Sequence, residues 1–258
     1  MNQTQVKLLD ILKKLKNEYG VVSVKAEFEA EGVRSDELIW LLELANKSDL
    51  KTALKIGGCE AVRDLIDSVT YGCDYIIAPM IESKYSLEKF ILAKDKIYPD
   101  ITNTQFLFNL ETITGFQNKV QMFDEAKDRL DGCVFGRVDY TGSLGIKRDQ
   151  IENSQITDDV LEVAKLAKSN NLDLVVGGGI SSSSLKSLKT IKDKYLSRFE
   201  TRKIVFSSDA LYTPNIENGL ALAVEFELLW LQNKRRFYSN IYKEDESRIK
   251  LLENRKNN

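Results

Sequence analysis

The sequence predicts an α/β fold, a (β/α)8 barrel of the TIM type. Short apolar runs rich in Val, Ile and Phe alternate with longer amphipathic segments, and this alternation is typical of βαβ units in a parallel sheet. The composition of the runs suits strands that are covered on both faces. The length of 258 residues also fits one large barrel.

Seven strands can be identified in order, with helical patterns between them. We expect the strands at 21–29, 52–57, 74–80, 105–111, 132–139, 172–179 and 202–208. We expect the intervening helices at 35–47, 59–72, 85–98, 115–130, 158–171 and 183–198, with an opening helix at 3–18. The eighth strand is missing from the pattern. Either one strand is cryptic or the barrel is modified at its first strand.

The chain divides into a barrel domain with an N-terminal helix, residues 1–214, and a C-terminal helical extension, residues 215–258. No linker rich in Gly, Pro or Ser separates the two. The end of the extension carries many charges around Phe237, Tyr238 and Ile241. This composition is typical of a solvated helix, and the alternative is a helix that is exchanged between subunits.

Composition and charge exclude several functional classes. The 37 Lys and Arg residues nearly balance 39 Asp and Glu residues, so we expect no nucleic-acid partner. No apolar run approaches the roughly 18 residues that cross a bilayer, so we expect no membrane partner. The amphipathic N-terminal segment does not resemble a signal peptide. Three Cys without a CxxC pair indicate a reducing, cytoplasmic location.

The chain contains no histidine. This excludes Ser-His-Asp triads, Cys-His dyads, HExxH zinc sites and histidine general bases within the chain. Catalysis must therefore use carboxylates, Lys, Arg, Tyr, Ser, Cys or a metal ion held by oxygen ligands.

Two carboxylates end neighbouring predicted strands. Glu111 ends the fourth strand and Asp139 ends the fifth, at the end of a barrel where reactive groups gather. By the alternation of side chains along a strand, Glu111 shares a face with Asn109, and Asp139 shares a face with Arg137. If both faces point into the barrel, a hard divalent cation would relieve the repulsion between the two acids.

The alternative is that each carboxylate pairs with a basic neighbour such as Lys25, Lys55 or Arg137. Lys55 is either a clamp on a substrate carboxylate or phosphate or a structural partner of Glu27 or Glu29. Arg137 is the better planar clamp, because a guanidinium offers a bidentate fork.

A glycine run follows the sixth strand. Residues Gly177, Gly178 and Gly179 lead through Ser181 into a helix and could present backbone N–H groups to an anion. The alternative is a tight turn without a ligand.

Several separated motifs together resemble the HpcH/HpaI family of aldolases and citrate lyase beta subunits. The resemblance covers roughly residues 21–180, and its motifs lie in the family's order. They are Glu111-Thr112, Asp131-Gly132, Gly136-Arg137-Val138-Asp139 and Ser143-Leu144-Gly145.

The resemblance implies a lyase that cleaves or forms carbon–carbon bonds in a small, pyruvate-like oxo acid or a related ester. It implies Mg²⁺ or Mn²⁺ bound by Glu111 and Asp139, which stabilises an enolate. Arg137 and Lys55, with Gly178 and Gly179, would bind the substrate. It also implies a homo-oligomer that forms through the C-terminal helix.

The sequence departs from the family at two functional positions. Lys55 stands where the family carries a substrate-binding Arg. The family's Asp-x-Glu-His run matches residues 27–30, in which Ala30 replaces the His. The base is then a carboxylate (Glu29 or Glu31), Lys25 or a metal-bound water. Of these we expect Glu29 to serve as the acid or base, with Lys55 and Arg137 as the other catalytic residues.

Two other functions remain open. The first is a barrel that binds a metal or a small anion without catalysis. The second is a phosphate-binding barrel enzyme of sugar metabolism, which would use the glycine run and Lys55.

Overall fold

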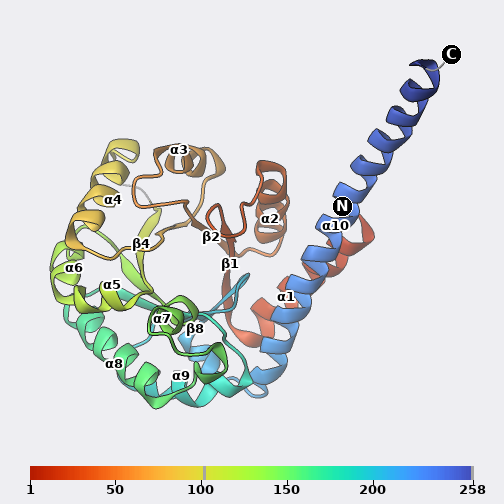
Figure 1. The fold of residues 1–258 in the computed structure, drawn as a ribbon. Helices are drawn as coiled ribbons and strands as arrows, with labels where there is room; N and C mark the ends of the chain where they lie inside the picture. Colours follow the sequence, from red (N-terminus) through yellow and green to blue (C-terminus); the bar gives the residue numbers. More distant parts are fainter. Residues whose placement is uncertain (101–102, 257–258) are drawn as a thin grey trace.

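The computed structural model describes residues 1–100 and 103–256. Within them, eight strands close into a barrel in the order β1 to β8, and helices surround it (Figure 1). The predicted TIM-type barrel is confirmed. The strands are β1 (Val21–Glu27), β2 (Lys51–Lys55), β3 (Tyr75–Ala78), β4 (Gln105–Leu110), β5 (Gly132–Gly136), β6 (Asp173–Gly177), β7 (Arg198–Glu200) and β8 (Ile204–Ser207).

Most helices follow the predicted pattern. The helix predicted at 115–130 is divided in two, the one predicted at 183–198 ends at Lys192, and α7 was not predicted. The α-helices are α1 (Gln3–Tyr19), α2 (Ser35–Lys47), α3 (Val62–Tyr71), α4 (Lys84–Ile97), α5 (Ile113–Gln117), α6 (Lys119–Ala126), α7 (Arg137–Ser143), α8 (Ser154–Ser169), α9 (Leu185–Lys192) and α10 (Ile216–Lys256). Short 3-10 turns are η1 (Arg148–Gln150), η2 (Ser182–Ser184) and η3 (Ser208–Tyr212). Local signals set their ends: Asn2 and Gln5 form a capping box before α1, and Gly20 ends it with φ 66°.

The modification of the barrel lies at its last strand and not at its first. Strands β1 to β7 pair in parallel, whereas β8 is antiparallel to both β7 and β1. The predicted strand at 202–208 corresponds to β8. The cryptic strand is β7, which lies where the sequence pattern placed the end of a helix; α9 instead ends at Lys192.

Strand β5 is shorter than predicted. It ends at Gly136, and residues from Arg137 onward begin α7. Cys133 and Phe135 belong to the large core between strands and helices. The expectation that Arg137 and Asp139 share one face of a strand is therefore wrong. Asp139 reaches the inner side of the barrel because the chain turns into a helix.

The barrel interior is filled below its carboxyl-terminal end. Six buried side chains from five strands form a separate cluster there: Ala53, Tyr75, Ile77, Leu107, Val134 and Val175. Such a plug makes the barrel a packed core and not a pore. The charged side chains described below lie at or near the carboxyl ends of the strands, and Lys25, Glu27 and Glu200 come from β1 and β7.

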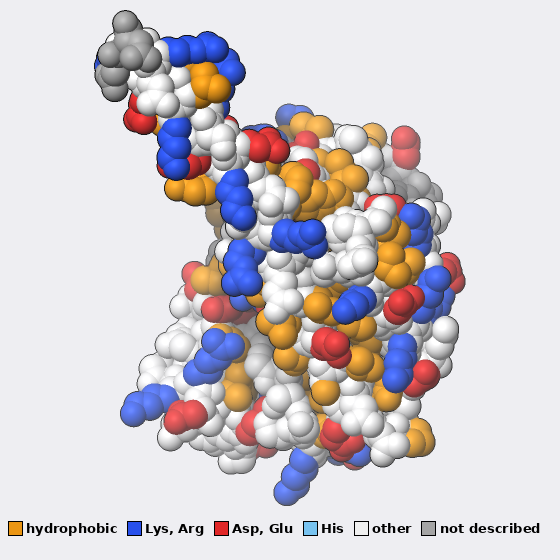
Figure 2. All heavy atoms as spheres, turned by 90° about the vertical axis from the view of Figure 1, so that its right-hand side faces the viewer, with side chains coloured by type: hydrophobic (Ala, Val, Ile, Leu, Met, Phe, Trp, Pro, Cys, Tyr) orange, Lys and Arg blue, Asp and Glu red, His pale blue; other side chains and the backbone are white. Residues whose placement is uncertain are grey.

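Helix α10 begins against the barrel and continues beyond it. Its first turns run beside α1, where Gly219 lies so close to Tyr19 that a Cβ would be 2.7 Å from the ring. Its second half projects away as an arm (Figures 1 and 2). None of the helices in residues 1–100 and 103–256 has an apolar stretch that could span a membrane.

Candidate active site

A cavity of about 520 Å³ opens at the carboxyl-terminal end of the barrel. Among the described residues, six acidic and four basic side chains line it, so the lining carries two more negative than positive charges. These side chains are Glu27, Glu29, Glu111, Asp139, Glu200, Glu227, Lys25, Lys55, Arg148 and Arg202. Such a surplus favours a bound cation.

Glu111 follows β4 and is the most enclosed carboxylate on this side of the cavity, with its side chain 2% exposed. Its Oε1 accepts a hydrogen bond of 2.9 Å from the Met80 N–H, and its Oε2 accepts one of 2.7 Å from Asn109 Nδ2. Burial raises the pKa of the Glu111 carboxyl, and the negative charge of Asp139 raises it further against the opposing effect of Lys55. The two acids predicted as metal ligands therefore interact across one cavity.

Gly136 leaves room for Glu111. A Cβ at this position would lie 2.7 Å from Glu111 Oε2, so only glycine lets the carboxylate lean over the end of β5. Asp139, three residues further on in the first turn of α7, is exposed and lines the same cavity.

Asn109 adds a third oxygen. Because a carboxylate only accepts hydrogen bonds, the contact with Glu111 fixes the amide with its nitrogen toward that acid. The buried Asn109 Oδ1 has no hydrogen-bond partner in the described structure. A buried acceptor without a partner is costly, and this oxygen belongs to a residue that lines the cavity.

Lys55, the last residue of β2, lines the cavity. Its Nζ lies 2.7 Å from Glu29 Oε2 and 3.4 Å from Glu111 Oε2. Burial alone would lower the pKa of Lys55, but the carboxylates of Glu111 and Glu29 outweigh it and raise the pKa above its usual range. Lys55 therefore stays charged between the predicted acid–base residue and a predicted metal ligand.

A second buried ion pair lies on another part of the cavity wall, and sequence reasoning missed it. Lys25 Nζ from β1 contacts the carboxylate of Glu200 from β7 and lies 3.4 Å from Glu27 Oε1. Burial alone would lower the pKa of Lys25, but Glu200 and Glu27 hold it above its usual range. Glu200 escaped notice because β7 spans only three residues, too few for a strand pattern.

Arg137 does not line the cavity. Its guanidinium is buried and donates hydrogen bonds to Gly178 O at 3.0 and 3.2 Å, to Glu152 at 3.0 Å and to Ser184 at 3.2 Å. The predicted role of Arg137 as a catalytic, substrate-holding residue does not fit this placement. The prediction failed because it took residues up to 139 as strand, which would have carried the side chain inward.

The other predicted site residues lie together. Glu29, Lys55, Gly178 and Gly179 line the same cavity as Glu111 and Asp139. Gly178 has φ 85°, and a Cβ there would lie 2.6 Å from the Val138 backbone nitrogen, so the glycine turn packs against the start of α7.

Arg148 is a cavity residue that the sequence did not reveal. It lies in the turn η1 after α7, lines the main cavity and an adjacent one, and is exposed. Within the described residues it has no ion pair or side-chain hydrogen bond, unlike the cavity-lining Lys25, Lys55 and Arg202. Its guanidinium is thus available for a ligand.

The residues present fit a hard divalent cation. No group of three or more Asp, Glu or Cys side chains in the described part of the chain is arranged to hold a metal. Mg²⁺, however, typically keeps several waters and takes only one or two carboxylates from the protein. Glu111, Asp139 and the free Asn109 Oδ1 supply oxygen donors, the type that Mg²⁺ and Mn²⁺ prefer.

Comparison with known families identifies the chain. The model of the family described as HpcH/HpaI aldolase/citrate lyase matches residues 47–183, just over half of the sequence. The chain belongs to this family. It is a lyase of the aldolase and citrate lyase type, and the matched segment includes Lys55, Glu111 and Asp139.

Solved structures support the fold. An HpcH/HpaI aldolase from Desulfitobacterium hafniense superposes with a TM-score of 0.58 and 13% identity, covering 75% of this chain and 82% of the other. An aldolase/citrate lyase family protein from Burkholderia cenocepacia gives 0.57 and 10%, covering 91% and 99%. A variant of the citrate synthase SbnG gives 0.56 and 16%, covering 75% and 81%. A search of curated protein sequences finds no match.

Proposed function

We propose that this chain is a divalent-metal-dependent lyase that cleaves or forms a carbon–carbon bond in a small oxo acid of the pyruvate type or a related ester. The observation that carries the proposal is the cluster at the ends of β4 and β5. There Glu111, Asp139 and the unpartnered Asn109 Oδ1 line a cavity with a surplus of negative charge.

In this proposal Glu111 and Asp139 hold Mg²⁺ or Mn²⁺. The bound ion would act as a Lewis acid for the oxo group and for the enolate charge that forms when the bond breaks. The Met80 N–H and the Asn109 amide keep the Glu111 carboxylate in place. This fixed orientation is what a preorganised site requires.

The substrate is an anion, and its carboxylate needs a cation to bind. Lys55 is shared between two acids, so Arg148 from η1 is better placed to form the bidentate contact. Gly178 and Gly179 line the adjoining wall and allow the substrate to approach the backbone.

Glu29, predicted as the acid or base, lies on the cavity wall against Lys55. A carboxylate at the cavity wall can accept a proton from a bound substrate. The chain has no histidine that could compete for this role.

We also infer a reducing, cytoplasmic location and a homo-oligomer. The three cysteines, Cys59, Cys73 and Cys133, are free thiols, which supports the first inference. The projecting arm of α10, with exposed Tyr242, Ile249 and Leu252, supports the second.

The test is turnover of oxaloacetate, whose decarboxylation forms the enolate of pyruvate. We expect activity with Mg²⁺ or Mn²⁺, loss with EDTA, and a fall of about 100-fold or more in Glu111→Gln and in Asp139→Asn. A barrel that only binds metals or anions would bind Mn²⁺ but show no turnover. A phosphate-handling enzyme would bind inorganic phosphate without added metal.

A further inference from the structure

The floor of the cavity is made of two glycines on adjacent strands. Gly136 of β5 pairs in register with Gly177 of β6. Neither has a side chain to fill the space above Val134 and Val175 of the interior cluster. The space over these two strands is therefore left for side chains from neighbouring strands.

A glutamate leans over each glycine. A Cβ at Gly136 would lie 2.7 Å from Glu111 Oε2, and a Cβ at Gly177 would lie 3.0 Å from both Cγ and Oε1 of Glu200. The register places the two acids at the same level. Glu111 and Gly136 come directly after the last two residues that pair between β4 and β5. In the same way, Gly177 and Glu200 come directly after the last two residues that pair between β6 and β7.

Each glutamate is matched with a lysine from a strand two places away in the barrel. Glu111 lies near Lys55, and Glu200 contacts Lys25. The metal site proposed above uses Glu111 and Asp139. The pair of Glu200 and Lys25 faces the same cavity and is not used by the function proposed so far.

We propose that Glu200 is a catalytic residue that carries a proton to and from the substrate across this glycine floor, with Lys25 as its positioning residue. This assignment rests on the proposed lyase function and replaces the predicted Glu29 in the acid–base role.

Burial favours Glu200 over Glu29. The Glu200 side chain is 4% exposed, whereas that of Glu29 is 25% exposed and lies against the lysine that also serves Glu111. A base shielded from water keeps the proton that it has taken and can return it to the same substrate.

Lys25 allows the buried Glu200 carboxylate to act as a base. An isolated buried carboxylate tends to take up a proton and could then accept none. The Lys25 ammonium contacts Glu200 and balances its negative charge. When Glu200 becomes protonated, Lys25 retains Glu27 as an anionic partner at 3.4 Å, so no buried charge is left alone.

In the proposed cleavage, the proton that Glu200 takes from the substrate is the proton that it returns to the product. In the cleavage direction, the hydroxyl proton of a 4-hydroxy-2-oxo acid passes to Glu200. The O–H electron pair forms the carbonyl of the aldehyde product, and the pair of the broken C–C bond passes to the oxo acid fragment as an enolate. Glu200 then gives the proton to the enolate carbon, so the products are an aldehyde and an oxo acid.

Two reactions separate this role from the metal site. Exchange of the pyruvate methyl protons with D2O, followed by proton NMR, needs a base. Decarboxylation of oxaloacetate needs enolate stabilisation but no removal of a proton from carbon. With Mg²⁺ present, we expect Glu200→Gln to lower the exchange rate by about 100-fold or more and to leave decarboxylation nearly unchanged. Glu200→Gln should lower the exchange rate more than Glu29→Gln does.

The two floor glycines give a matched control pair. The added methyl group in Gly177→Ala would crowd the Glu200 side chain. This variant should lower the rate of methyl proton exchange while decarboxylation of oxaloacetate persists. The added methyl group in Gly136→Ala would crowd the Glu111 carboxylate, and this variant should lower the rates of both reactions. Retention of exchange in Glu200→Gln with its loss in Glu29→Gln would overturn the assignment, and so would equal loss of both reactions in Glu200→Gln. A wild-type protein that catalyses neither reaction would instead overturn the lyase function on which the assignment rests.

Discussion

Two arginines near the cavity, Arg137 and Arg148, have different roles: one stabilises the fold and the other is free to bind a ligand. Arg137 is buried and fully engaged with Gly178, Glu152 and Ser184, so it fastens the glycine turn to α7. Arg148 is exposed at the cavity and makes no ion pair within residues 1–100 and 103–256. The same residue type therefore has a structural role in one position and is free to bind a ligand in the other.

Arg148→Ala should weaken substrate binding without weakening the fold. We expect KM for the oxo acid to rise about 10- to 100-fold, since a hydrogen bond to a charged group contributes about 1.5–3 kcal/mol. The melting temperature should stay unchanged because the side chain holds nothing in place. Steady-state kinetics with thermal unfolding checks both. An unchanged KM, or a lower melting temperature, would contradict this role.

The sequence predicts individual cavity residues correctly where the strand ends at the expected position. Glu111 and Asn109 share the cavity side because β4 runs to Leu110. It failed for Arg137 because the last residue of β5 is set by packing: Gly136 lets Glu111 lean across, and the chain turns there into α7. No local pattern contains that tertiary contact.

Among the elements, the hairpin of β7 and β8 is the one that departs most from a regular barrel. Its connection, residues 201–203, brings Arg202 and Lys203 to Glu31 in the loop after β1. The hairpin thereby joins the two edges of the sheet. Regular apolar runs revealed the other seven strands, including β8, whereas β7 is too short to produce a pattern and its direction depends on the tertiary closure.

Glu37 of α2 anchors α10 and makes that contact sensitive to pH. It accepts hydrogen bonds from Lys234 at 3.0 Å and Tyr238 at 2.7 Å. Burial alone would raise the pKa of Glu37, but the bonds from Tyr238 and Lys234 outweigh it and lower the pKa below its usual range. A lowered pKa means that the stabilisation is complete above pH about 4.5 and is lost as pH falls below that value.

Glu37→Gln should therefore destabilise the protein at neutral pH more than in acid. We expect a loss of about 1–3 kcal/mol in the free energy of unfolding at pH 7. The difference from wild type should be smaller at pH about 3, because the stabilisation that comes with the lowered pKa declines as the pH falls below 4.5. Urea unfolding of both proteins at the two pH values checks this. An equal difference at both pH values would show that the charge of Glu37 contributes nothing.

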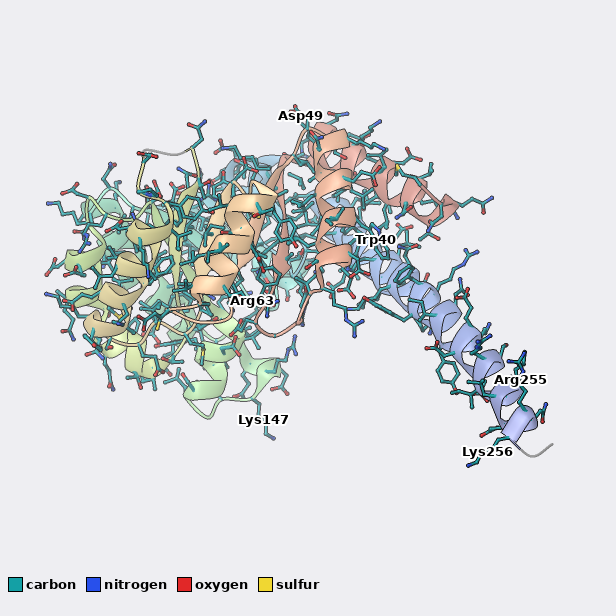
Figure 3. The ribbon with its side chains drawn as sticks, turned by 90° about the horizontal axis from the view of Figure 1, so that it is seen from above. Trp40, Asp49, Arg63, Lys147, Arg255 and Lys256 are labelled. Carbon is teal, nitrogen blue, oxygen red and sulfur yellow. The ribbon has the colours of Figure 1, made fainter. Side chains whose placement is uncertain are left out.

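At the scale of the whole molecule, the projecting arm of α10 needs an explanation. Its exposed apolar side chains, Tyr242, Ile249 and Leu252, are spaced seven and three residues apart, which places them on one helix face. Figure 3 shows the arm inclining toward the side of the barrel where Lys147 lies, next to the cavity residue Arg148. We propose that a second copy of the chain covers this face.

Removal of residues 239–258 tests the role of the arm, because it spares Lys234 and Tyr238 and so keeps the contact with α2. We expect the full chain to be oligomeric by light scattering after size exclusion, and the shortened chain to be a smaller species with an unchanged melting temperature of the barrel. A monomeric full chain, or a shortened chain of unchanged oligomeric state, would contradict the proposal.

The central claim is that Glu111 and Asp139 together hold a divalent ion to which an oxo acid binds. Calorimetric titration with oxalate, an analogue of the pyruvate enolate, tests it most directly. The account predicts that the wild-type protein binds oxalate with Mn²⁺ or Mg²⁺ present and not after EDTA treatment, and that Glu111→Gln and Asp139→Asn bind none under either condition. Equal oxalate binding without metal, or metal-dependent binding that survives both substitutions, would contradict it.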